Sequence, residues 1–394
     1  MKPAILLSIL GLAAAVPSSS GLNRRKDDGD DTKTMKLLIG APNRVLVADY
    51  DGKKFDVKDR LNLEGRPSWM LYKGSTNTIY SVDEDSDKLL YFEFEPGYEL
   101  ADGLNEESGS TGVVHLAFNK NQTRMLGSSY GEGTLDVWNI SNKNPELIDT
   151  LNTDNNSWPF PREGQSRLHQ AVLEPTGKFF AVNDLETDTI LVVDARDDDK
   201  YNITNYHRVE DGCGPRHGVF HGEDADKKAT HYTVVCEKSN LLLTYKVGYK
   251  ETTLEFVYSQ TMSTFDPANP PKNVTDAAAG ALIYSKPNLY VSNRLTGHEE
   301  DDFSHFTVSD KGQLAFKKGH TSKADNPRMM SFSLDDSHLF VANIEGPKSL
   351  HAFKKGDDGN LEDASHADLT RWVDDKVEEN NGPWFVMEVD TDSK

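Results

Sequence analysis

Residues 168–195 read LHQAVLEPTGKFFAVNDLETDTILVVDA, a phrase of three short apolar runs in which the second run ends in Asn183-Asp184. Alternating Val, Ile, Leu and Phe in these runs indicate half-buried antiparallel strands. The phrase recurs in five more stretches, which begin near Pro67, Val113, Pro215, Ala279 and Pro327. A spacing of roughly 45–65 residues is typical of propeller blades, which are small antiparallel sheets arranged in a ring. The repeat therefore predicts an all-β propeller.

The two ends of the chain resemble complementary parts of one more blade. Lys36–Phe55 has the pattern of a second and a third strand, whereas Gly382–Val389 has the pattern of a first strand. Joining them would close the ring and remove sheet edges that otherwise invite aggregation. We therefore expect a seven-bladed β-propeller over residues 35–390, closed by its N- and C-terminal strands.

The first residues have the features of a secretory signal. Residues 1–20 combine Lys2, an apolar stretch and small residues, which predicts a signal peptide, and the charged residues 21–34 predict a disordered leader. Secretion agrees with five Asn-x-Ser/Thr glycosylation sequons, at Asn121, Asn139, Asn155, Asn202 and Asn273. Asn121 and Asn155 lie in polar, turn-like segments and are the best expected acceptors. No other apolar run approaches the ~20 residues of a membrane span, so we predict a secreted glycoprotein without a membrane anchor.

The chain has two cysteines, Cys213 and Cys236. An even number in an oxidising compartment favours a disulfide, and both residues are expected at the same end of one blade. Two free buried thiols are the alternative.

The formal net charge is −21, from 64 acidic and 43 basic residues. Such a chain repels nucleic acid and anionic lipid at long range, so neither is an expected partner. An anionic substrate would need a local basic pocket. The charge does not indicate an oligomeric state.

In a propeller, the innermost strand of each blade begins at the same face where the second strand ends. Polar residues at these two points of successive repeats should converge on the mouth of the central channel. The candidates are His169, Arg216, His217, Glu237, Arg294 and Arg328. Each alone could have a structural role, since acids cap turns and arginines pair with acids. As a set they indicate an anion site, because arginine matches carboxylate or phosphate in bidentate geometry.

We expect neither a cofactor nor a metal. The chain has no GxGxxG, P-loop, HExxH or CxxC signature, and we expect no nucleophile elbow of the GxSxG type. The acidic run His298–Asp302 is expected to be a solvated loop.

Four runs, SRLHQAVLEPTGKFFAVNDLETD, GCGPRHGVFHG, NLYVSNR and NPRMMSFSLDDSHLFVAN, resemble the lactonase-type seven-bladed propellers. This family includes bacterial 6-phosphogluconolactonases and the fungal 3-carboxy-cis,cis-muconate lactonising enzyme, a carboxymuconate cyclase. The resemblance covers the chain after the leader. It implies a catalytic set of one His, two Arg and one Glu at the channel mouth, which here correspond to His169, Arg216, Arg294 and Glu237.

The resemblance leaves three functions open. The first expectation is a cofactor-free lactonising isomerase (an intramolecular lyase) that acts on a polycarboxylated substrate. Arg216 and Arg294 would hold the carboxylates, and His169 or Glu237 would deliver the proton. Arg328 and His217 would add further substrate contacts. The alternatives are a lactone hydrolase of the 6-phosphogluconolactonase type and a secreted, non-catalytic propeller that binds a partner.

Overall fold

A computed structural model describes residues 34–94, 97, 99–100, 103–153, 159, 164–345, 349–367 and 382–390. The expected signal peptide, nearly all of the expected leader and the sequon at Asn155 lie outside the described residues.

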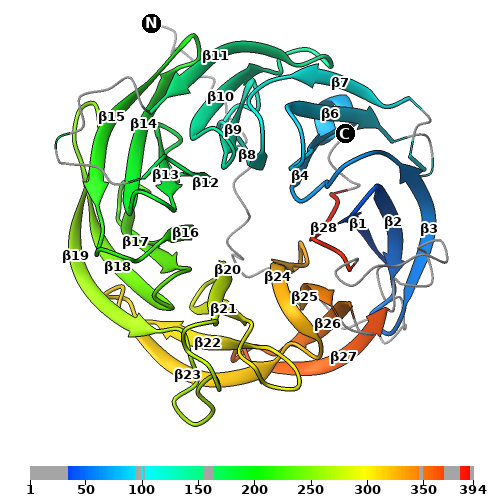
Figure 1. Cartoon of the computed structure of the whole chain (residues 1–394), viewed down its shortest axis with the longest axis vertical. Helices are drawn as coiled ribbons and strands as arrows, with labels where there is room; N and C mark the ends of the chain where they lie inside the picture. Colours follow the sequence, from blue (N-terminus) through cyan, green and yellow to red (C-terminus); the bar gives the residue numbers. More distant parts are fainter. Residues whose placement is uncertain are drawn as a thin grey trace, which may run out of the picture.

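The described chain forms seven four-stranded antiparallel sheets around a central channel (Figure 1). This confirms the all-β, seven-bladed architecture expected from the repeat. The first three blades contain β28 (Phe385–Glu388), β1 (Met35–Ala41), β2 (Arg44–Tyr50) and β3 (Phe55–Asn62); β4 (Met70–Lys73), β5 (Thr78–Val82), β6 (Lys88–Glu93) and β7 (Asn105–Ser108); and β8 (Val113–Phe118), β9 (Arg124–Ser129), β10 (Thr134–Asn139) and β11 (Glu146–Asn152). A single turn of 3-10 helix, Gly74–Thr76, joins β4 to β5.

The other four blades follow in chain order. They contain β12 (Leu168–Leu173), β13 (Phe179–Asp184), β14 (Thr189–Asp197) and β15 (Lys200–Arg208); β16 (Pro215–Glu223), β17 (Ala229–Cys236), β18 (Leu241–Tyr249) and β19 (Leu254–Ser263); β20 (Ala278–Ser285), β21 (Asn288–Arg294), β22 (Asp302–Val308) and β23 (Leu314–Thr321); and β24 (Asp325–Phe332), β25 (His338–Glu345), β26 (Leu350–Lys355) and β27 (Leu361–Ala367).

The C-terminal strand closes the ring as expected. β28 pairs antiparallel with β1, from Leu37 opposite Glu388 to Gly40 opposite Phe385. The amide of Trp384 donates to Gly40 O at 2.8 Å and extends this pairing beyond the strand. In Figure 1, β28 lies between β1 and the channel, so the last strand of the chain is the innermost strand of the first blade.

The hydrophobic core lies between neighbouring blades. One cluster, for example, joins Phe179 of β13 to Val234 and Tyr232 of β17, each at most 1% exposed. Because each blade buries its two faces against its neighbours, second strands such as β13, β17 and β21 are almost entirely buried. The innermost strands are therefore held rigidly, and the side chains at their starts have fixed positions.

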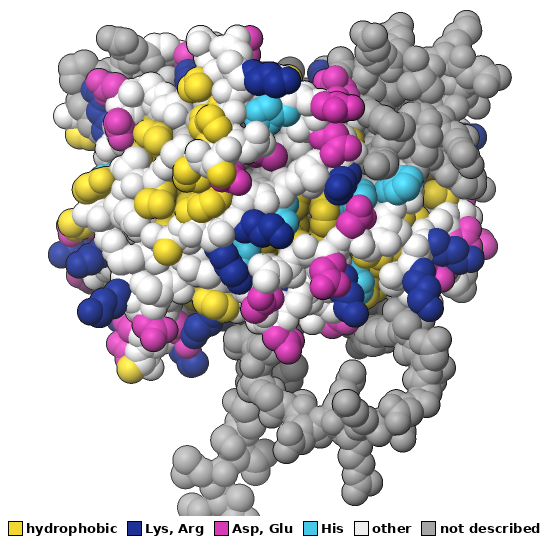
Figure 2. Space-filling model, turned by 90° about the horizontal axis from the view of Figure 1, so that it is seen from below, with side chains coloured by type: hydrophobic (Ala, Val, Ile, Leu, Met, Phe, Trp, Pro, Cys, Tyr) yellow, Lys and Arg dark blue, Asp and Glu magenta, His cyan; other side chains and the backbone are white. Residues whose placement is uncertain are grey.

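The rim of the ring is polar. Figure 2 shows acidic and basic side chains interspersed over the outer wall with scattered apolar ones, as expected for a strongly charged surface. Within the described ranges, no helix has the length and apolar character needed to cross a membrane.

Candidate functional site

Bulges at the starts of the innermost strands aim side chains toward the channel. In the five blades that begin with β8, β12, β16, β20 and β24, the pairing of the first with the second strand skips one or two residues near its beginning. The skipped residues are Val114, His169, Arg216 with His217, Gly280 with Ala281, and Arg328. A bulge re-aims the side chain that the ladder leaves unpaired. The same local irregularity thus delivers most of the candidate residues to one place.

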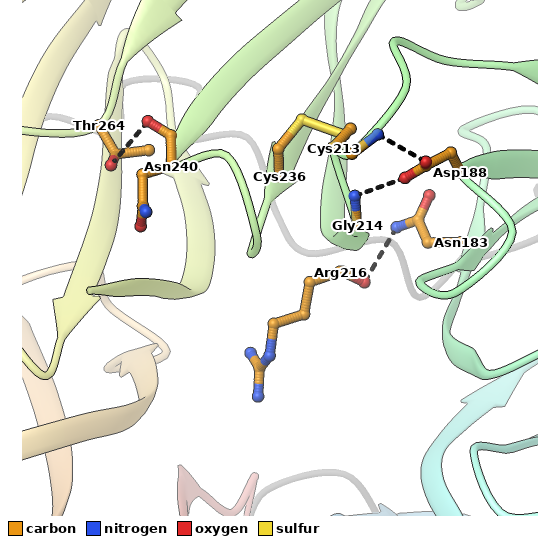
Figure 3. The surroundings of a disulfide bond; sticks show 9 residues. Asn183, Asp188, Cys213, Gly214, Arg216, Cys236, Asn240 and Thr264 are labelled. Atoms are coloured by element: carbon orange, nitrogen blue, oxygen red, sulfur yellow. Dashed lines mark hydrogen bonds between the residues drawn. A yellow bond between two sulfur atoms is a disulfide. The ribbon is translucent and has the colours of Figure 1, made fainter. Parts of the chain in front are cut away.

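Arg216 and Arg294 meet on one oxygen of Glu237. Arg216 Nε lies 2.7 Å, and Arg294 Nη2 lies 2.9 Å, from Glu237 Oε2. The Arg216 contact is a charge contact without hydrogen-bond alignment, since that Nε has no hydrogen-bond partner among the described residues. Arg216 is 2% exposed, and Figure 3 shows its side chain extending into the open centre of the ring. Three groups from two blades therefore form one charged cluster at the channel mouth.

Gly280 makes room for Arg294. A Cβ on Gly280 would lie 2.6 Å from Ser292 Oγ and 3.1 Å from Arg294 Nε. The guanidinium of Arg294 donates to the carbonyls of Ala278 at 3.3 Å and Ala279 at 3.4 Å, so it lies along the inner strand β20. In this blade the inner strand begins with four residues that are all alanine or glycine, and the second strand supplies the site's side chain across them.

Arg328 completes the basic wall from another blade. Its Nη2 donates to Glu84 Oε2 at 2.9 Å and Oε1 at 3.2 Å, and its guanidinium lies 4.2 Å from the ring centre of Trp384. Arg66 approaches the same indole at 4.9 Å. At the mouth, three guanidiniums (Arg216, Arg294 and Arg328) face two carboxylates, which leaves an excess positive charge in a chain of net charge −21.

Histidine and tryptophan rings form the other wall. His169 and His217 meet edge to face with centroids 5.1 Å apart, and Trp69 packs against His115 at 4.2 Å. Arg216 Nη1 lies 3.4 Å from His217 Nε2. Trp69, His169, Arg216 and His217 line a small pocket together with Ser68, Val114, Arg328, Met329 and Trp384. Among the described residues, the buried Ser68 Oγ, His169 Nδ1 and the indole nitrogens of Trp69 and Trp384 have no hydrogen-bond partner.

The electrostatics of the pocket keep its histidines neutral. Burial lowers the pKa of His169 well below the ordinary value of 6.5, and the charge of Arg216 adds to this shift. Burial and Arg216 act in the same direction on the pKa of His217, and burial lowers the pKa of His115 to about 3. A neutral imidazole can accept a proton, which makes His169 competent as a base.

The arginines remain charged in spite of their burial. Burial, together with the nearby Arg294, lowers the pKa of Arg216 to about 9, still above neutral pH. Burial alone would raise the pKa of Glu237. The charges of Arg294 and Arg216 outweigh burial and hold the pKa of Glu237 below its usual range. Glu237 is therefore an anion that offsets part of the arginine charge, and it is poorly suited to be the general acid.

The structure brings the six candidate residues to one mouth of the channel, where some line the pocket and others contact a lining residue. His169, Arg216, His217 and Arg328 line the pocket directly, and Glu237 and Arg294 join it through Arg216. Other polar residues at equivalent points have structural contacts, as the turn-capping alternative predicted. Asn183 accepts from Tyr232 Oη at 2.9 Å and donates to Arg216 O at 3.2 Å.

Sequence reasoning missed Glu84, Trp69 and Trp384. Glu84 follows the second strand of its blade, as Glu237 does, and Trp384 stands just before an innermost strand, as His169 stands at the start of one. The rule that selects residues at strand starts and ends also selects Glu84 in the repeat near Pro67 and Trp384 at the closing strand.

A serine motif in the chain is structural. Gly127–Gly131 has the GxSxG pattern of a nucleophile elbow, which the sequence reading did not expect. Ser129 is fully buried, donates to Thr111 O at 2.6 Å and accepts from Glu132 N at 2.9 Å. It ends a strand of an all-β blade, without the strand-to-helix turn that exposes a nucleophile.

No group of three or more His, Cys, Asp or Glu side chains within the described ranges could hold a metal ion.

Cys213 and Cys236 form a disulfide directly behind Arg216 (Figure 3). Pro215, the first residue of β16, pairs with Cys236, the last residue of β17. The bond joins the start of the strand that carries Arg216 to the end of the strand that precedes Glu237. It therefore ties together the backbone of two members of the charged cluster.

The fold and the pocket define an all-β propeller with a basic pocket at one mouth of its channel. The sequence model of the family described as "Lactonase, 7-bladed beta-propeller" matches residues 36–369, and the chain belongs to this family. The sequence is 28% identical over 267 residues, which is 64% of each chain, to an Arthroderma benhamiae protein named "Probable 6-phosphogluconolactonase". The match thus spans less than two thirds of that relative.

Solved structures show the same fold. The periplasmic gluconolactonase of Pseudomonas aeruginosa is 18% identical with a TM-score of 0.70, covering 91% of this chain and 99% of that one. A protein from Lactobacillus plantarum is 20% identical with a TM-score of 0.73, covering 91% of this chain and all of the other.

Proposed function

We propose that the protein hydrolyses a small anionic sugar lactone of the 6-phosphogluconolactone type. The observation that carries this proposal is the pair of buried arginines on one oxygen of Glu237, beside a neutral His169. Family membership and the name of the Arthroderma relative support a lactonase. The expected carboxymuconate cyclase has no such support, so hydrolysis takes precedence over lactonisation.

The substrate's phosphate or carboxylate would bind at Arg216 and Arg294. Each guanidinium keeps donors that Glu237 does not use, because Glu237 contacts one nitrogen of each. An anion placed there would offset the repulsion between the two arginines. It would also raise the pKa of His169 from its depressed value, because the charge of Arg216 is one cause of that depression.

His169 would then act as the general base. It would take a proton from water while the water oxygen bonds to the lactone carbonyl carbon. Collapse of the tetrahedral intermediate breaks the bond from that carbon to the ring oxygen, and the imidazolium returns the proton to the leaving alkoxide. The product is the open hydroxy acid, which ionises at neutral pH. Positioned proton transfer of this kind contributes roughly 10²–10⁴-fold.

The test measures hydrolysis of 6-phosphogluconolactone above its spontaneous rate, with unphosphorylated gluconolactone for comparison. Arg216→Lys and Arg294→Lys keep the charge but lose the bidentate fork, so KM for the phosphorylated lactone should rise at least about tenfold. His169→Gln should lower kcat instead. Arg196→Lys, at an exposed pair with Asp194 on β14, is the matched control and should behave as the parent. No rate above background, or equal effects of all the lysine variants, would refute the proposal.

We also propose that the protein is secreted and glycosylated. Asn121, Asn202 and Asn273 are exposed and accessible to a glycan. Asn139 is half-buried, and its Oδ1 accepts from Arg124 Nη1 at 3.0 Å, so we expect it to stay unmodified. Expression with the leader in a eukaryotic host, followed by glycopeptide mass spectrometry, checks this. A glycan at Asn273 in a sample without hydrolytic activity would favour the non-catalytic binder, because Lys272 N donates to Thr296 O beside Arg294.

A further inference from the structure

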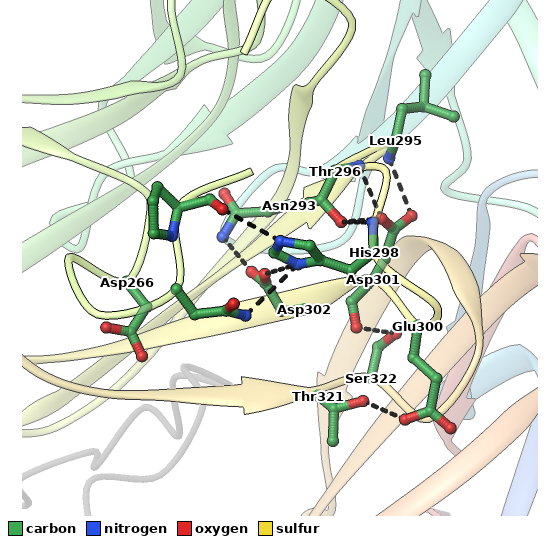
Figure 4. A network of polar contacts seen from close by, with 12 residues as sticks. Asp266, Asn293, Leu295, Thr296, His298, Glu300, Asp301, Asp302, Thr321 and Ser322 are labelled. Carbon is green, nitrogen blue, oxygen red and sulfur yellow. Dashed lines mark hydrogen bonds and ion pairs between the residues drawn. The ribbon is translucent and has the colours of Figure 1, made fainter. Parts of the chain in front are cut away.

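One buried aspartate joins the segments that carry two of the three site arginines. Asp301 precedes β22 and is 3% exposed. Its Oδ1 accepts from Thr296 N at 2.8 Å and Thr296 Oγ1 at 2.7 Å. Its Oδ2 accepts from Leu295 N at 2.9 Å and Asn326 N at 2.8 Å. Figure 4 shows the first three of these bonds converging on the one carboxylate.

Two of the bound amides belong to residues in the left-handed region. Leu295 has φ 56° and Asn326 has φ 59°. Asparagine tolerates this conformation, but leucine rarely adopts it, and such a conformation persists only where surrounding contacts impose it. Leu295 directly follows Arg294, and Asn326 stands two residues before Arg328. The carboxylate thus fixes the backbone next to one arginine and at the start of the strand that carries the other.

The same device recurs at other strand starts of the pocket. In each case an aspartate accepts from the amide two residues before a side chain that lines the pocket. The pairs are Asp83 with Arg66 N at 3.0 Å before Ser68, Asp184 with Arg167 N at 2.8 Å before His169, and Asp188 with Gly214 N at 2.7 Å before Arg216. Figure 3 shows the last pair. The amide just before such a strand start lies beyond the ladder, and a carboxylate satisfies it with a strong bond.

We infer that Asp301 is a positioning residue that holds Arg294 and Arg328 in place at the pocket mouth and so sets the affinity for the anionic group that Arg294 would bind. The inference rests on the proposed function, in which the anionic group belongs to the substrate. Anion binding itself can be measured without hydrolysis. Asp301 itself points at backbone and not at the pocket. It acts through Arg294, at the end of β21, and Arg328, on β24 of the next blade.

The experiment measures the Kd of inorganic phosphate for the full chain by calorimetry. Asp301→Asn should weaken phosphate binding at least about tenfold, since misplacing binding groups by about 1 Å can cost up to 10²-fold. Thr296→Val removes one of the four bonds, keeps the carboxylate and should cause a smaller loss. Asp335→Asn is the control, because Asp335 accepts from Ser337 N at 3.0 Å in the turn at the far end of the same blade as Arg328. The control should keep the parent Kd.

A rescue separates positioning from mere stabilisation. Glycine adopts positive φ without steric cost. Adding Leu295→Gly to Asp301→Ala should therefore recover part of the phosphate affinity, whereas a purely stabilising role would change the melting temperature and leave Kd of the folded protein alone. Parent-like Kd in both Asp301→Asn and Thr296→Val, or a parent that binds no phosphate, would overturn the inference. Phosphate binding without lactone hydrolysis would overturn only the proposed function.

Discussion

Arg216 and Arg294, which are separated by a whole blade boundary, are held against the same oxygen of Glu237 at 2.7 and 2.9 Å. Two buried cations that share one anion still repel each other, and a second anion would offset that repulsion. The two arginines and Glu237 carry a net positive charge, which a bound carboxylate or phosphate would neutralise under the function proposed above.

We expect the Glu237 carboxylate, which Arg216 and Arg294 share, to lower the affinity of the site for anions. Glu237→Gln should leave Arg216 and Arg294 without an anionic partner and lower the free energy of unfolding by about 1–3 kcal/mol. The same change should tighten phosphate binding and steepen its dependence on salt, because the excess positive charge grows. Urea unfolding and calorimetry at two ionic strengths measure both effects. Weaker phosphate binding in the variant would show that Glu237 contributes to the ligand site directly.

Gly280 is required for the position of Arg294. Gly280→Ala places a methyl group 3.1 Å from Arg294 Nε and 2.6 Å from Ser292 Oγ, so the guanidinium should move away from Glu237. We expect phosphate binding to weaken about tenfold, with a loss of about 1–3 kcal/mol in stability from overpacking. Gly103→Ala is the control, since a Cβ there meets no atom within 4 Å. Equal phosphate affinity in both alanine variants would contradict this role.

The closing strand supports both the ring and the pocket. Removing the residues after Asn380 deletes β28 and Trp384 and exposes the edge of β1. It also removes the Trp384 indole against which the Arg328 guanidinium packs. We expect a melting temperature lower by at least about 5 °C and loss of phosphate binding. A peptide of residues 382–390 added in trans should restore part of both. An unchanged melting temperature in the truncated chain would contradict the closure.

Stability should fall in mild acid. Burial is the main cause that lowers the pKa of ten of the twelve histidines: His115, His169, His207, His217, His221, His231, His305, His320, His338 and His351. The pKa falls to about 3 for His115 and His221 and to about 4 for His207, His305 and His320. These groups stay neutral in the folded protein, whereas the unfolded chain binds protons below about pH 6.5.

The sign of this linkage is a loss of stability as the pH falls. The stability is fully present above about pH 6.5, and each histidine that stays neutral in the folded protein costs up to about 1.4 kcal/mol per pH unit below that value. Four aspartates oppose the trend, since burial raises the pKa of Asp302 to about 6 and also raises the pKa of Asp136, Asp184 and Asp325, but the ten histidines outnumber them. Urea unfolding at pH 7.5, 6.5 and 5.5 checks the slope, and His221→Gln should reduce it. A stability that does not change over this range would refute the prediction.

Much of the fold could be predicted from the sequence because its determinants are local. The repeated runs, their turns and the complementary ends predict seven blades and the closure by Gly382–Val389. The residue types at strand starts and ends, such as His169 and Glu237, predict which positions face the channel mouth, since the geometry of a blade is the same in every copy.

Only the tertiary structure decided which arginine pairs with which glutamate. The sequence places Arg216, Arg294 and Arg328 at equivalent points, but it does not show that the first two share Glu237 while the third pairs with Glu84, 244 residues away. Glu237 shares a blade with Arg216 and neighbours the blade of Arg294, whereas Arg328 and Glu84 come from blades that lie far apart in the sequence. Bulges, small residues such as Gly280 and the bond network of Asp301 then aim each side chain. Contacts of this kind depend on the packing of several blades at once, so no local pattern encodes them.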